Sequence, residues 1–385
     1  MDIYDALIVG GGLAGLLCAR EIAKEGFRVR VFEEHLEIGR PEKCDGLISL
    51  RALKELGFDK DEKFIRNRIK KASLFSPKGY ELSLKAENQE VIVLDRALFD
   101  KEIAKQASNH GVEISLGSKV KHLKKEGLKL ENSDFQGRYI VDAGGCQSLL
   151  NYRKEGVLQA GKYEISGDWF DKDRVELYFN QELTPGFFLW LIPLSEDYCK
   201  IGAAGYRINP FKVIDRFLKN KKCTIVRKIA APINVGGTLT SFQKENLFFV
   251  GDAAGQTKPT TAGGIYTGGM GGIFAGKSIV SNLKGERSLS YTELWKRKFS
   301  KEFDVMKMGR KLFERFNNDA LDRLFKILKD SSFEEKVPLE GDFDFHSKVF
   351  LSSLKIKEIT KLLFFLAEVE YKNLLKGLKK ISKSK

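Results

Sequence analysis

The chain has 385 residues, of which 42% are hydrophobic and 31% are charged. This balance is typical of a globular protein with two or three domains, and it excludes a disordered chain and a small disulfide-bonded scaffold. The longest uninterrupted apolar run, residues 187–194, is too short to span a bilayer, so we do not expect an integral membrane protein. The N-terminus lacks the basic region of a cleaved signal peptide.

The net charge indicates which classes of partner to expect, and the cysteine spacing indicates whether a metal site is expected and which compartment suits the chain. Lysine and arginine outnumber the acidic residues by 66 to 52, giving a net charge of +14. That charge favours an acidic protein or an anionic membrane surface as partner, although a solvated lysine-rich surface explains it equally well. No nucleic-acid motif is present, so no nucleic-acid partner is expected. None of the five cysteines forms a Cys-x-x-Cys pair. This pattern predicts no metal site and suits the cytoplasm.

The first residues have the pattern of a β-α-β unit. Residues 6–9 predict a short buried strand, and a glycine turn follows it. Residues 16–24 predict a helix that ends at Gly26, and residues 29–33 predict a second strand. This order of elements predicts a doubly wound α/β fold.

The later segments differ in character. Residues 99–109 predict a helix, whereas residues 160–235 have strand patterns with Gly and Pro turns. A glycine-rich helix is predicted near 263–283. From about residue 288 onward the pattern is helical and basic.

The glycine turn has the spacing of a dinucleotide-binding fingerprint, Gly10-x-Gly12-x-x-Gly15. In such a turn, Gly10 permits the tight bend, Gly12 lets the backbone approach a pyrophosphate, and Gly15 lets helix and strand pack closely. Glu33 ends the second strand, where an acid accepts hydrogen bonds from ribose hydroxyls. A glycine turn with no ligand is the alternative, but the strand–turn–helix context and the acid favour a dinucleotide.

A second glycine box lies near the end of the predicted sheet. Residues 248–255 form a strand that leads into Gly-Asp-Ala-Ala-Gly, where Asp252 is placed to bind the ribityl hydroxyls of a flavin. Gly263, Gly264 and Ile265 begin the next helix, whose amides would stabilise reduced flavin. The cluster 268–272 is interpreted as close helix packing. A single fingerprint with this downstream box favours FAD over NAD, the alternative being a simple strand–turn–helix connection.

The motif order resembles that of the FAD-dependent geranylgeranyl reductases, within the para-hydroxybenzoate-hydroxylase-like flavoproteins. The resemblance covers roughly residues 1–300. Three segments carry it: residues 41–46, which match the family's PxxCxG motif, residues 94–100, and residues 251–255. The resemblance implies FAD contacts at Ala14, Glu33, Cys44, Asp45, Arg96, Val120, Asp252, Gly264 and Ile265. Arg96 suits a phosphate or the flavin edge. Val120 suits the adenine end, which it would contact through its backbone.

The chain departs from the family pattern in two places. The aromatic signature YxWxFP is Phe-Leu-Trp-Leu-Ile-Pro here, so that Phe188 replaces the tyrosine and Ile192 the second aromatic. The tyrosine hydroxyl, and any role it has in placing substrate, is therefore absent. Gly144 stands where hydroxylase relatives have an aspartate, which counts against a monooxygenase.

These features predict a fold class and a domain order. We expect an α/β fold: a Rossmann-like FAD-binding domain, an inserted, mainly antiparallel β-sheet substrate domain and a helical C-terminus. The FAD-binding domain spans 1–155, with an excursion near 70–93 towards the substrate domain, and resumes at 236–287. Residues 156–235 form the substrate domain, and 288–385 the helical basic region.

The implied reaction is reduction of C=C bonds in geranylgeranyl chains of a membrane lipid or prenyl diphosphate, by hydride from flavin N5 plus a proton. Cys44 is the candidate catalytic residue, as proton donor or organiser, because an ordinary thiol is mostly protonated at neutral pH. A buried, inert cysteine is the alternative. Phe187, Phe188, Trp190 and Pro193 are predicted to line an apolar tunnel for the prenyl chain, or else an ordinary strand core.

Two rival functions remain open, an FAD-dependent monooxygenase and an electron-transfer flavoprotein of quinone-reductase type. No second nucleotide fingerprint is present, so an acidic electron donor such as ferredoxin is a candidate partner. Residues 350–378 alternate apolar residues with lysines in the pattern of a basic amphipathic helix. This pattern suits peripheral contact with the inner face of the membrane, although such a helix more often packs on its own domain.

Overall fold

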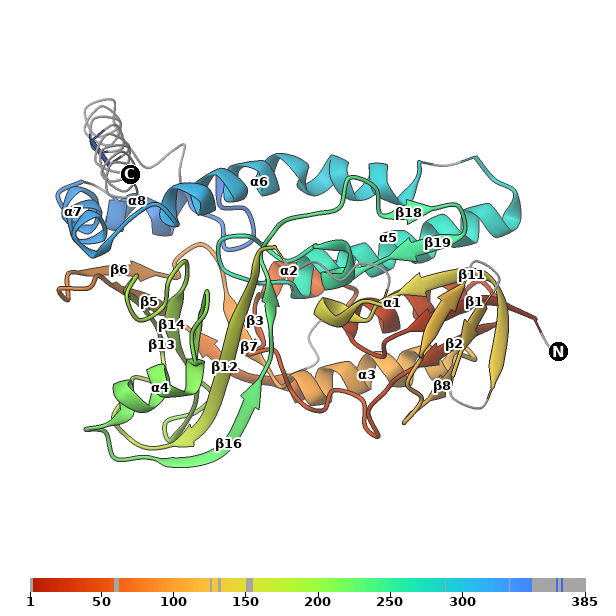
Figure 1. Ribbon diagram of the computed structural model, residues 1–385, viewed down its shortest axis with the longest axis horizontal. Helices are drawn as coiled ribbons and strands as arrows, with labels where there is room; N and C mark the ends of the chain where they lie inside the picture. Colours follow the sequence, from red (N-terminus) through yellow and green to blue (C-terminus); the bar gives the residue numbers. More distant parts are fainter. Residues whose placement is uncertain are drawn as a thin grey trace, which may run out of the picture. The chain divides into compact units, whose positions relative to one another are not determined.

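A computed structural model describes most of the chain in two compact units (Figure 1). The described residues are 3–58, 62–124, 127–130, 133–149, 155–287, 289–331 and 333–347, together with Phe365, Glu368 and Val369. The first unit comprises Met1–Arg66, Ile92–Val157 and Pro232–Asp304, and the second comprises Asn67–Val91, Leu158–Ala231 and Val305–Lys385. Both units are therefore assembled from separate stretches of sequence.

The first unit is built on a mainly parallel sheet of eight strands. Its main path has the order β18-β19-β11-β1-β2-β8, and β9 and β10 extend from β11. The strands are β1 (Ile3–Val9), β2 (Val29–Phe32), β8 (Glu113–Ser115), β9 (His122–Lys124), β10 (Gly127–Lys129), β11 (Asp134–Asp142), β18 (Gln243–Lys244) and β19 (Leu247–Phe249). Since β1 pairs in parallel with both β2 and β11, the predicted doubly wound sheet is confirmed.

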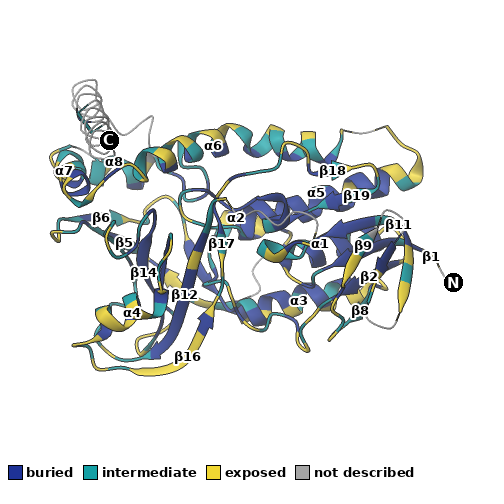
Figure 2. Cartoon of the chain, in the orientation of Figure 1, coloured by how far each residue is buried: buried dark blue, intermediate teal, exposed yellow. Residues whose placement is uncertain are grey.

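Burial on both faces explains the apolar strand at the centre of this sheet. Residues 6–9 of β1 are all buried, so the run is continuously apolar rather than alternating. Helix α1 (Leu13–Ala23) is also buried almost all round, because α3 (Arg96–Asn109) and α5 (Ile265–Lys284) both pack against it. Figure 2 shows α1 and α5 as mainly buried helices.

Helices α1 and α5 approach each other through glycine. A Cβ added at Gly272 would lie 2.2 Å from the backbone oxygen of Ala14, and one at Gly276 would lie 2.9 Å from that of Cys18. A Cβ at Gly269 would lie 3.2 Å from the Leu17 side chain of α1 and 2.7 Å from the Leu56 side chain. The prediction that the glycine cluster of α5 serves close helix packing is therefore confirmed.

The second unit contains a mainly antiparallel sheet with the order β16-β12-β15-β14-β13-β5-β6. Its strands are β5 (Lys71–Phe75), β6 (Glu81–Lys85), β12 (Val157–Ser166), β13 (Arg174–Phe179), β14 (Phe188–Pro193), β15 (Tyr198–Gly205) and β16 (Thr224–Ala230). Only β13 and β5 pair in parallel among these neighbours. Helix α4 (Pro210–Leu218) packs its buried Ile214 and Leu218 into a core that includes Tyr163 and Leu191.

Short elements complete the fold. A three-stranded sheet has the order β3-β7-β4. Its strands are β3 (Leu47–Ser49), β4 (Ile65–Ile69) and β7 (Val91–Leu94), and the remaining elements are α2 (Leu50–Glu55), β17 (Ile233–Asn234) and the 3₁₀ turns η1 (Glu62–Phe64), η2 (Gly145–Gln147) and η3 (Gly251–Ala254).

The chain then becomes helical, as its sequence predicts. Helices α6 (Tyr291–Phe313), α7 (Asn318–Lys329) and α8 (Phe333–Glu340) follow one another. The predicted amphipathic helix over 350–378 lies outside the described residues except for Phe365, Glu368 and Val369. Phe365 is buried in a cluster with Phe316 and Leu321, and Val369 packs against the same cluster. Within the described part of the chain, no helix is both long enough and apolar enough to cross a bilayer.

The glycine contact between α1 and α5 can be tested by adding one methyl group. We expect Gly272→Ala to lower the free energy of unfolding by about 1–3 kcal/mol, because the two backbones must separate. Lys277→Ala changes an exposed residue of the same helix and should stay within about 0.5 kcal/mol of the unaltered protein. Urea titration measures both, and an unchanged midpoint for Gly272→Ala would contradict the close approach.

Candidate functional site

The glycine fingerprint forms a tight turn between β1 and α1. Gly10 has a φ of +104°, and a Cβ there would lie 2.4 Å from the backbone oxygen of Ala143. A Cβ at Gly15 would lie 2.2 Å from the backbone oxygen of Gly10. Neither position can hold a side chain without moving the backbone, so the turn has the geometry that its sequence predicts.

Gly12 differs from its two neighbours in the motif. It is exposed, and a Cβ added there would meet no described atom within 4 Å. Gly12 is also the N-cap of α1, and the described residues provide no side-chain cap and no acidic residue in the first turn. The free amides of this turn therefore border open space, which is the arrangement that binds a phosphate anion.

Glu33 lies beside this turn, directly after β2. Its Oε2 accepts a 2.7 Å hydrogen bond from the backbone N–H of Gly11, and its Oε1 accepts one of 3.0 Å from that of His35. The His35 ring nitrogen Nδ1 is 2.5 Å from the same Oε1. Sequence reasoning gave His35 no role, yet the ring helps to fix the carboxylate.

Val120 packs its side chain into the core with Tyr4 and Phe32, which leaves its backbone for any ligand contact.

The second glycine box meets the start of α1. Gly251 has a φ of +62°, and a Cβ there would lie 3.0 Å from the Cβ of Ala14. Half-buried Asp252 follows, and its Oδ1 accepts a 2.5 Å hydrogen bond from Thr257. Its Oδ2 lies 3.6 Å from the Cys146 sulfur. Burial, followed by the charge of Asp252, raises the pKa of Cys146 and keeps it a thiol.

Helix α5 begins beside Asp252. A Cβ at Gly264, the N-cap of α5, would lie 3.3 Å from the Asp252 Oδ1. The described residues give this helix no side-chain cap and no acid in its first turn, and Ile265 is buried. Half-buried Gly263 accepts a 3.0 Å hydrogen bond from the Lys258 N–H, which closes the preceding loop. Two uncapped helix N-termini thus lie in the first unit with the acids Glu33 and Asp252.

A buried hydrogen-bond network holds the second box in place. The Gln256 side chain accepts a 2.8 Å bond from the Gly251 N–H and donates one of 2.8 Å to the Tyr291 hydroxyl. That hydroxyl in turn donates to the backbone oxygen of Phe249 at 2.9 Å. Burial raises the pKa of Tyr291 well above its ordinary value, so the hydroxyl keeps its proton. Sequence reasoning missed Gln256 and Tyr291, because no local motif joins them.

The segment around Cys44 packs against the end of β7 and the first turn of α3. Gly46 has a φ of +89°, a Cβ there would lie 2.2 Å from the backbone oxygen of Leu94, and its own oxygen accepts from the Leu94 N–H at 2.9 Å. Gly39 approaches the backbone of Ala97 in the same manner. Half-buried Cys44 and Asp45 therefore belong to a loop held by backbone contacts at both ends.

The side chain of Arg96 reaches from α3 to this loop. It binds both carboxylate oxygens of Asp100, at 2.9 and 3.1 Å, and its charge interacts with the Cys44 side chain. Burial works against the charge on Arg96, but Asp100 and Cys44 outweigh it and raise the pKa of the guanidinium. Arg96 is therefore a permanent cation in the electrostatic neighbourhood of Cys44. Asp100, which sequence reasoning did not single out, is the residue that anchors it.

The four residues predicted to contact a prenyl chain lie together in the second unit and are all buried. Phe187 and Phe188 stack with ring centroids 4.0 Å apart, and each meets Trp190 edge-on at 6.2 Å. The Trp190 indole covers Gly202, where a Cβ would lie 2.2 Å from the ring. Pro193 ends the same strand, β14. Phe187, Phe188 and Trp190 thus form one aromatic cluster.

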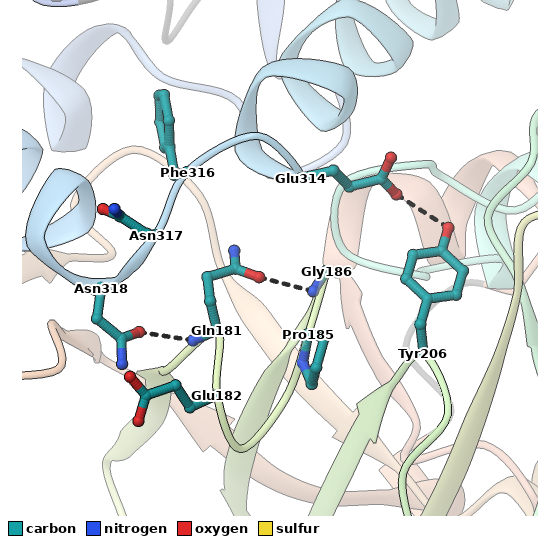
Figure 3. A pocket seen from close by; sticks show the side chains of 9 residues that line it. All are labelled: Gln181, Glu182, Pro185, Gly186, Tyr206, Glu314, Phe316, Asn317 and Asn318. Atoms are coloured by element: carbon teal, nitrogen blue, oxygen red, sulfur yellow. Dashed lines mark hydrogen bonds between the residues drawn. The ribbon is translucent and has the colours of Figure 1, made fainter. Parts of the chain in front are cut away.

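A separate cleft in the second unit has a volume of about 410 Å³ (Figure 3). Its lining residues come from the loops after β13 and β15 and from the α6–α7 connection: Gln181, Glu182, Pro185, Gly186, Tyr206, Glu314, Phe316, Asn317 and Asn318. Several of its polar groups bond one another, as when Tyr206 donates to Glu314 at 2.9 Å. None of the four residues predicted to contact a prenyl chain is among these lining residues. Its lining mixes polar side chains with Pro185 and Phe316, whereas a site for a prenyl chain would be mostly apolar.

Sequence comparisons place the chain among known proteins. Residues 8–40 match a family model described as an NAD(P)-binding Rossmann-like domain. A protein of unassigned function from Methanocaldococcus jannaschii is 31% identical over 92% of this chain and 96% of its own length. The digeranylgeranylglycerophospholipid reductases of M. jannaschii and Methanosarcina acetivorans are 29% and 26% identical over 86% of this chain, and over 92% and 90% of their own lengths.

Solved structures show the same fold. A geranylgeranyl bacteriochlorophyll reductase-like protein of Thermoplasma acidophilum has a TM-score of 0.81 and 24% identity, over 95% of this chain and 100% of that one. A flavin-dependent brominase has a TM-score of 0.67 and 17% identity, over 97% and 99%. The predicted Rossmann-like fold with its antiparallel sheet is thereby confirmed. The chain belongs to the geranylgeranyl reductase family and is a flavin-dependent oxidoreductase.

Proposed function

We propose that the flavin is FAD and that it binds in the first unit. The open space at Gly12 and the uncapped first turn of α1 suit its pyrophosphate. Glu33 would accept from the ribose hydroxyls, and Asp252 from the ribityl chain. The amides of the first turn of α5, after Gly264, would face the flavin ring. These groups come from distant parts of the sequence but belong to one compact unit.

We propose that the reaction is the reduction of C=C bonds in the prenyl chains of a membrane lipid. The activity for which the digeranylgeranylglycerophospholipid reductases are named supports this substrate class. The observation that carries the proposal is the placement of Cys44. Its side chain is an electrostatic neighbour of Arg96, on a loop of the same unit that holds the dinucleotide turn. A prenyl diphosphate remains a second form of the same substrate class.

In the proposed reaction, one residue of this chain would donate a proton and four others would bind the prenyl chain. When bound, reduced FAD would supply a hydride to one carbon of the double bond. The Cys44 thiol gives its proton to the other carbon and is left as a thiolate, which solvent reprotonates. Phe187, Phe188, Trp190 and Pro193 would contact the prenyl chain and exclude water from it. Each reduced bond gains two hydrogens, and each consumes one reduced flavin.

The two rival functions receive less support. A monooxygenase relative would carry an aspartate where this chain has Gly144. The buried carboxylate nearby is Asp142, and its two oxygens already accept from the Gly144 N–H and the Ser148 hydroxyl. An electron-transfer flavoprotein has no need of a positioned thiol. Neither function explains why Cys44 and Arg96 are electrostatic neighbours.

We further propose that the protein works on the cytoplasmic face of the membrane and takes electrons from a small acidic protein of the ferredoxin type. A lipid substrate and a net charge of +14 support both partners. The basic amphipathic pattern at 350–378 is the proposed membrane contact. Phe365 and Val369 pack against α7 and its N-terminal connection, so the helix would offer its lysines rather than these side chains to the lipid.

The cofactor assignment predicts that Gly12→Ala separates folding from binding. The residue has a φ of −83° and open space around it, so the unfolding free energy should change by less than about 1 kcal/mol. The new methyl group would occupy the proposed pyrophosphate position, so the purified protein should lose its FAD. Flavin absorbance and FAD titration measure this, with Lys277→Ala as a control that retains FAD. Full FAD content in Gly12→Ala would contradict the assignment.

The reaction predicts that Cys44→Ala retains FAD but loses prenyl reduction by a factor of about 10²–10⁴. The assay is anaerobic: chemically reduced holoenzyme is mixed with a geranylgeranyl lipid, and both flavin reoxidation and the mass of the product are followed. Cys223→Ala is the matched control, because Cys223 is also a half-buried thiol but belongs to the second unit. A reduced flavin that reacts with oxygen or a quinone but never with the lipid would favour the rivals.

The membrane proposal predicts that reversing Lys376, Lys379 and Lys380 to Glu weakens binding to anionic vesicles roughly tenfold or more at low salt. These three lysines lie outside the described residues. Lys105, Lys121 and Lys244 are exposed lysines of the first unit, and their reversal to Glu gives a control with the same change in net charge. Vesicle sedimentation compares the two triple variants, and equal binding by both would refute the C-terminal contact.

A further inference from the structure

The end strand of the antiparallel sheet carries an exposed apolar pair. β16 is the first strand in the order of that sheet, and it pairs with β12. Residues 224–228 of β16 are all exposed, with Ile225 at 39% and Val226 at 54% (Figure 2). A strand that covered a core would bury every second side chain. Residues 224–228 are therefore held in the sheet by backbone pairing rather than by buried side chains.

A β-bulge interrupts the pairing at this apolar pair. Arg227 lies opposite Glu164 and Ile225 lies opposite Ile165, so Val226 is the extra residue of the bulge. A bulge twists an edge strand and, together with charged side chains, opposes its pairing with a strand of another molecule. Two apolar side chains thus remain exposed at an edge that is unsuited to accept a further strand.

Cations surround the apolar pair on β16 and on the neighbouring helix α4. Residues 212–228 include seven cations and a single acid, Asp215, whereas the whole chain has 66 cations and 52 acids. Arg227 is paired with Glu164 of β12 at 3.3 Å. Six of the seven cations are exposed: Lys212, Arg216, Lys219, Lys222, Arg227 and Lys228. These six cations, together with Ile225 and Val226, are called the α4–β16 surface below.

Aromatic rings connect α4 and β16. Tyr163 of β12 stacks on Phe211 of α4 with ring centroids 5.5 Å apart, and the Lys228 ammonium of β16 lies 4.8 Å from the same Tyr163 ring. The Lys221 ammonium, between the two elements, lies 4.1 Å from the Trp169 ring. Because both lysines lie over rings that pack in or against one core cluster, the helix and the strand present their cations around a common centre.

We propose that the α4–β16 surface binds an anionic lipid bilayer, with its cations at the headgroup phosphates and with Ile225 and Val226 inserted at the interface. This proposal rests on the proposed action on a membrane lipid, and it names a surface separate from the segment 350–378. Cations are attracted to anionic headgroups, and exposed apolar side chains gain free energy when they leave water. Interfacial binding becomes stronger as both contributions increase.

A bilayer suits this surface better than a protein partner does. A second copy of the chain would bring the same excess of positive charge against it. A strand of another protein would meet the bulge at Val226. An acidic electron donor has to approach the flavin, which we propose in the first unit, whereas residues 212–228 belong to the second. Of these partners, a fluid anionic surface alone uses both the cations and the apolar pair.

Vesicle sedimentation of the resting holoenzyme tests the cations without any turnover. The vesicles contain equal parts of phosphatidylglycerol and phosphatidylcholine, and no prenyl chains. We expect reversal of Lys212, Lys222 and Lys228 to Glu to weaken binding roughly tenfold or more at low salt. The triple reversal in the first unit described above changes the net charge equally and serves as the control. Equal binding by these two triple variants, or no binding by the unaltered protein, would overturn the proposal.

High salt separates insertion from charge attraction, because it screens exposed charges but leaves apolar contacts intact. At about 0.5 M salt, we expect Ile225→Ser combined with Val226→Ser to lower the remaining vesicle binding about threefold or more. Leu98→Ser combined with Leu116→Ser is the control, since both leucines are 44% exposed and belong to the first unit. Binding that depends on the lysines but never on Ile225 and Val226 would assign the surface to an acidic protein and overturn insertion.

The vesicle measurements and the prenyl-reduction assay fail independently. If the holoenzyme binds vesicles through this surface but never reduces a geranylgeranyl lipid, the proposed function is wrong and the surface assignment stands. If the lysine variant reduces a detergent-dispersed lipid normally and the same lipid in vesicles slowly, both proposals are supported. Unfolding midpoints within about 1 kcal/mol of the unaltered protein show that the variants fold.

Discussion

The first unit depends on the close approach of two helix backbones. Gly272 and Gly276 of α5 lie against the backbone of α1 at Ala14 and Cys18, with no room for a side chain between them. This contact sets how far the start of α1 lies from Gly251, which itself touches Ala14. That approach brings the uncapped start of α1 close to the Gly251–Asp252 turn. A wider helix spacing would leave the same residues in the sequence without bringing them to one place.

The site presents backbone amides rather than lysine side chains to an anionic ligand. In the described residues, the first turns of α1 and α5 contain no acidic side chain and no side-chain cap. Amides and helix dipoles have a fixed orientation, so they need no reordering when charge appears on a ligand. In the proposed FAD complex, the side-chain acids Glu33 and Asp252 would accept hydrogen bonds from hydroxyl groups. In this arrangement, backbone N–H groups would bind the charged groups of the ligand, and the two carboxylates would bind its hydroxyl groups.

Much of this arrangement could be predicted from the sequence, because it rests on short-range patterns. Gly10, Gly12 and Gly15 have their expected geometry because it is determined by the short turn to which they belong. The packing role of residues 268–272 also followed from the lack of a buried strand before them. The partners of Arg96 did not follow. The resemblance implies that this arginine contacts an FAD phosphate or the flavin edge, and the structure adds an ion pair with Asp100, one turn further along α3.

Gln256 illustrates a constraint of another kind. Its side chain occupies the space in front of Gly271, where a Cβ would lie 2.0 Å from Oε1, and it bonds both Gly251 and Tyr291. Any side chain at position 271 must displace this amide and leave buried partners unbonded. Position 271 can therefore diverge only after position 256 has become smaller, and the reverse order passes through a defective intermediate. The two positions should show strong epistasis during evolution, with one permitted order of change.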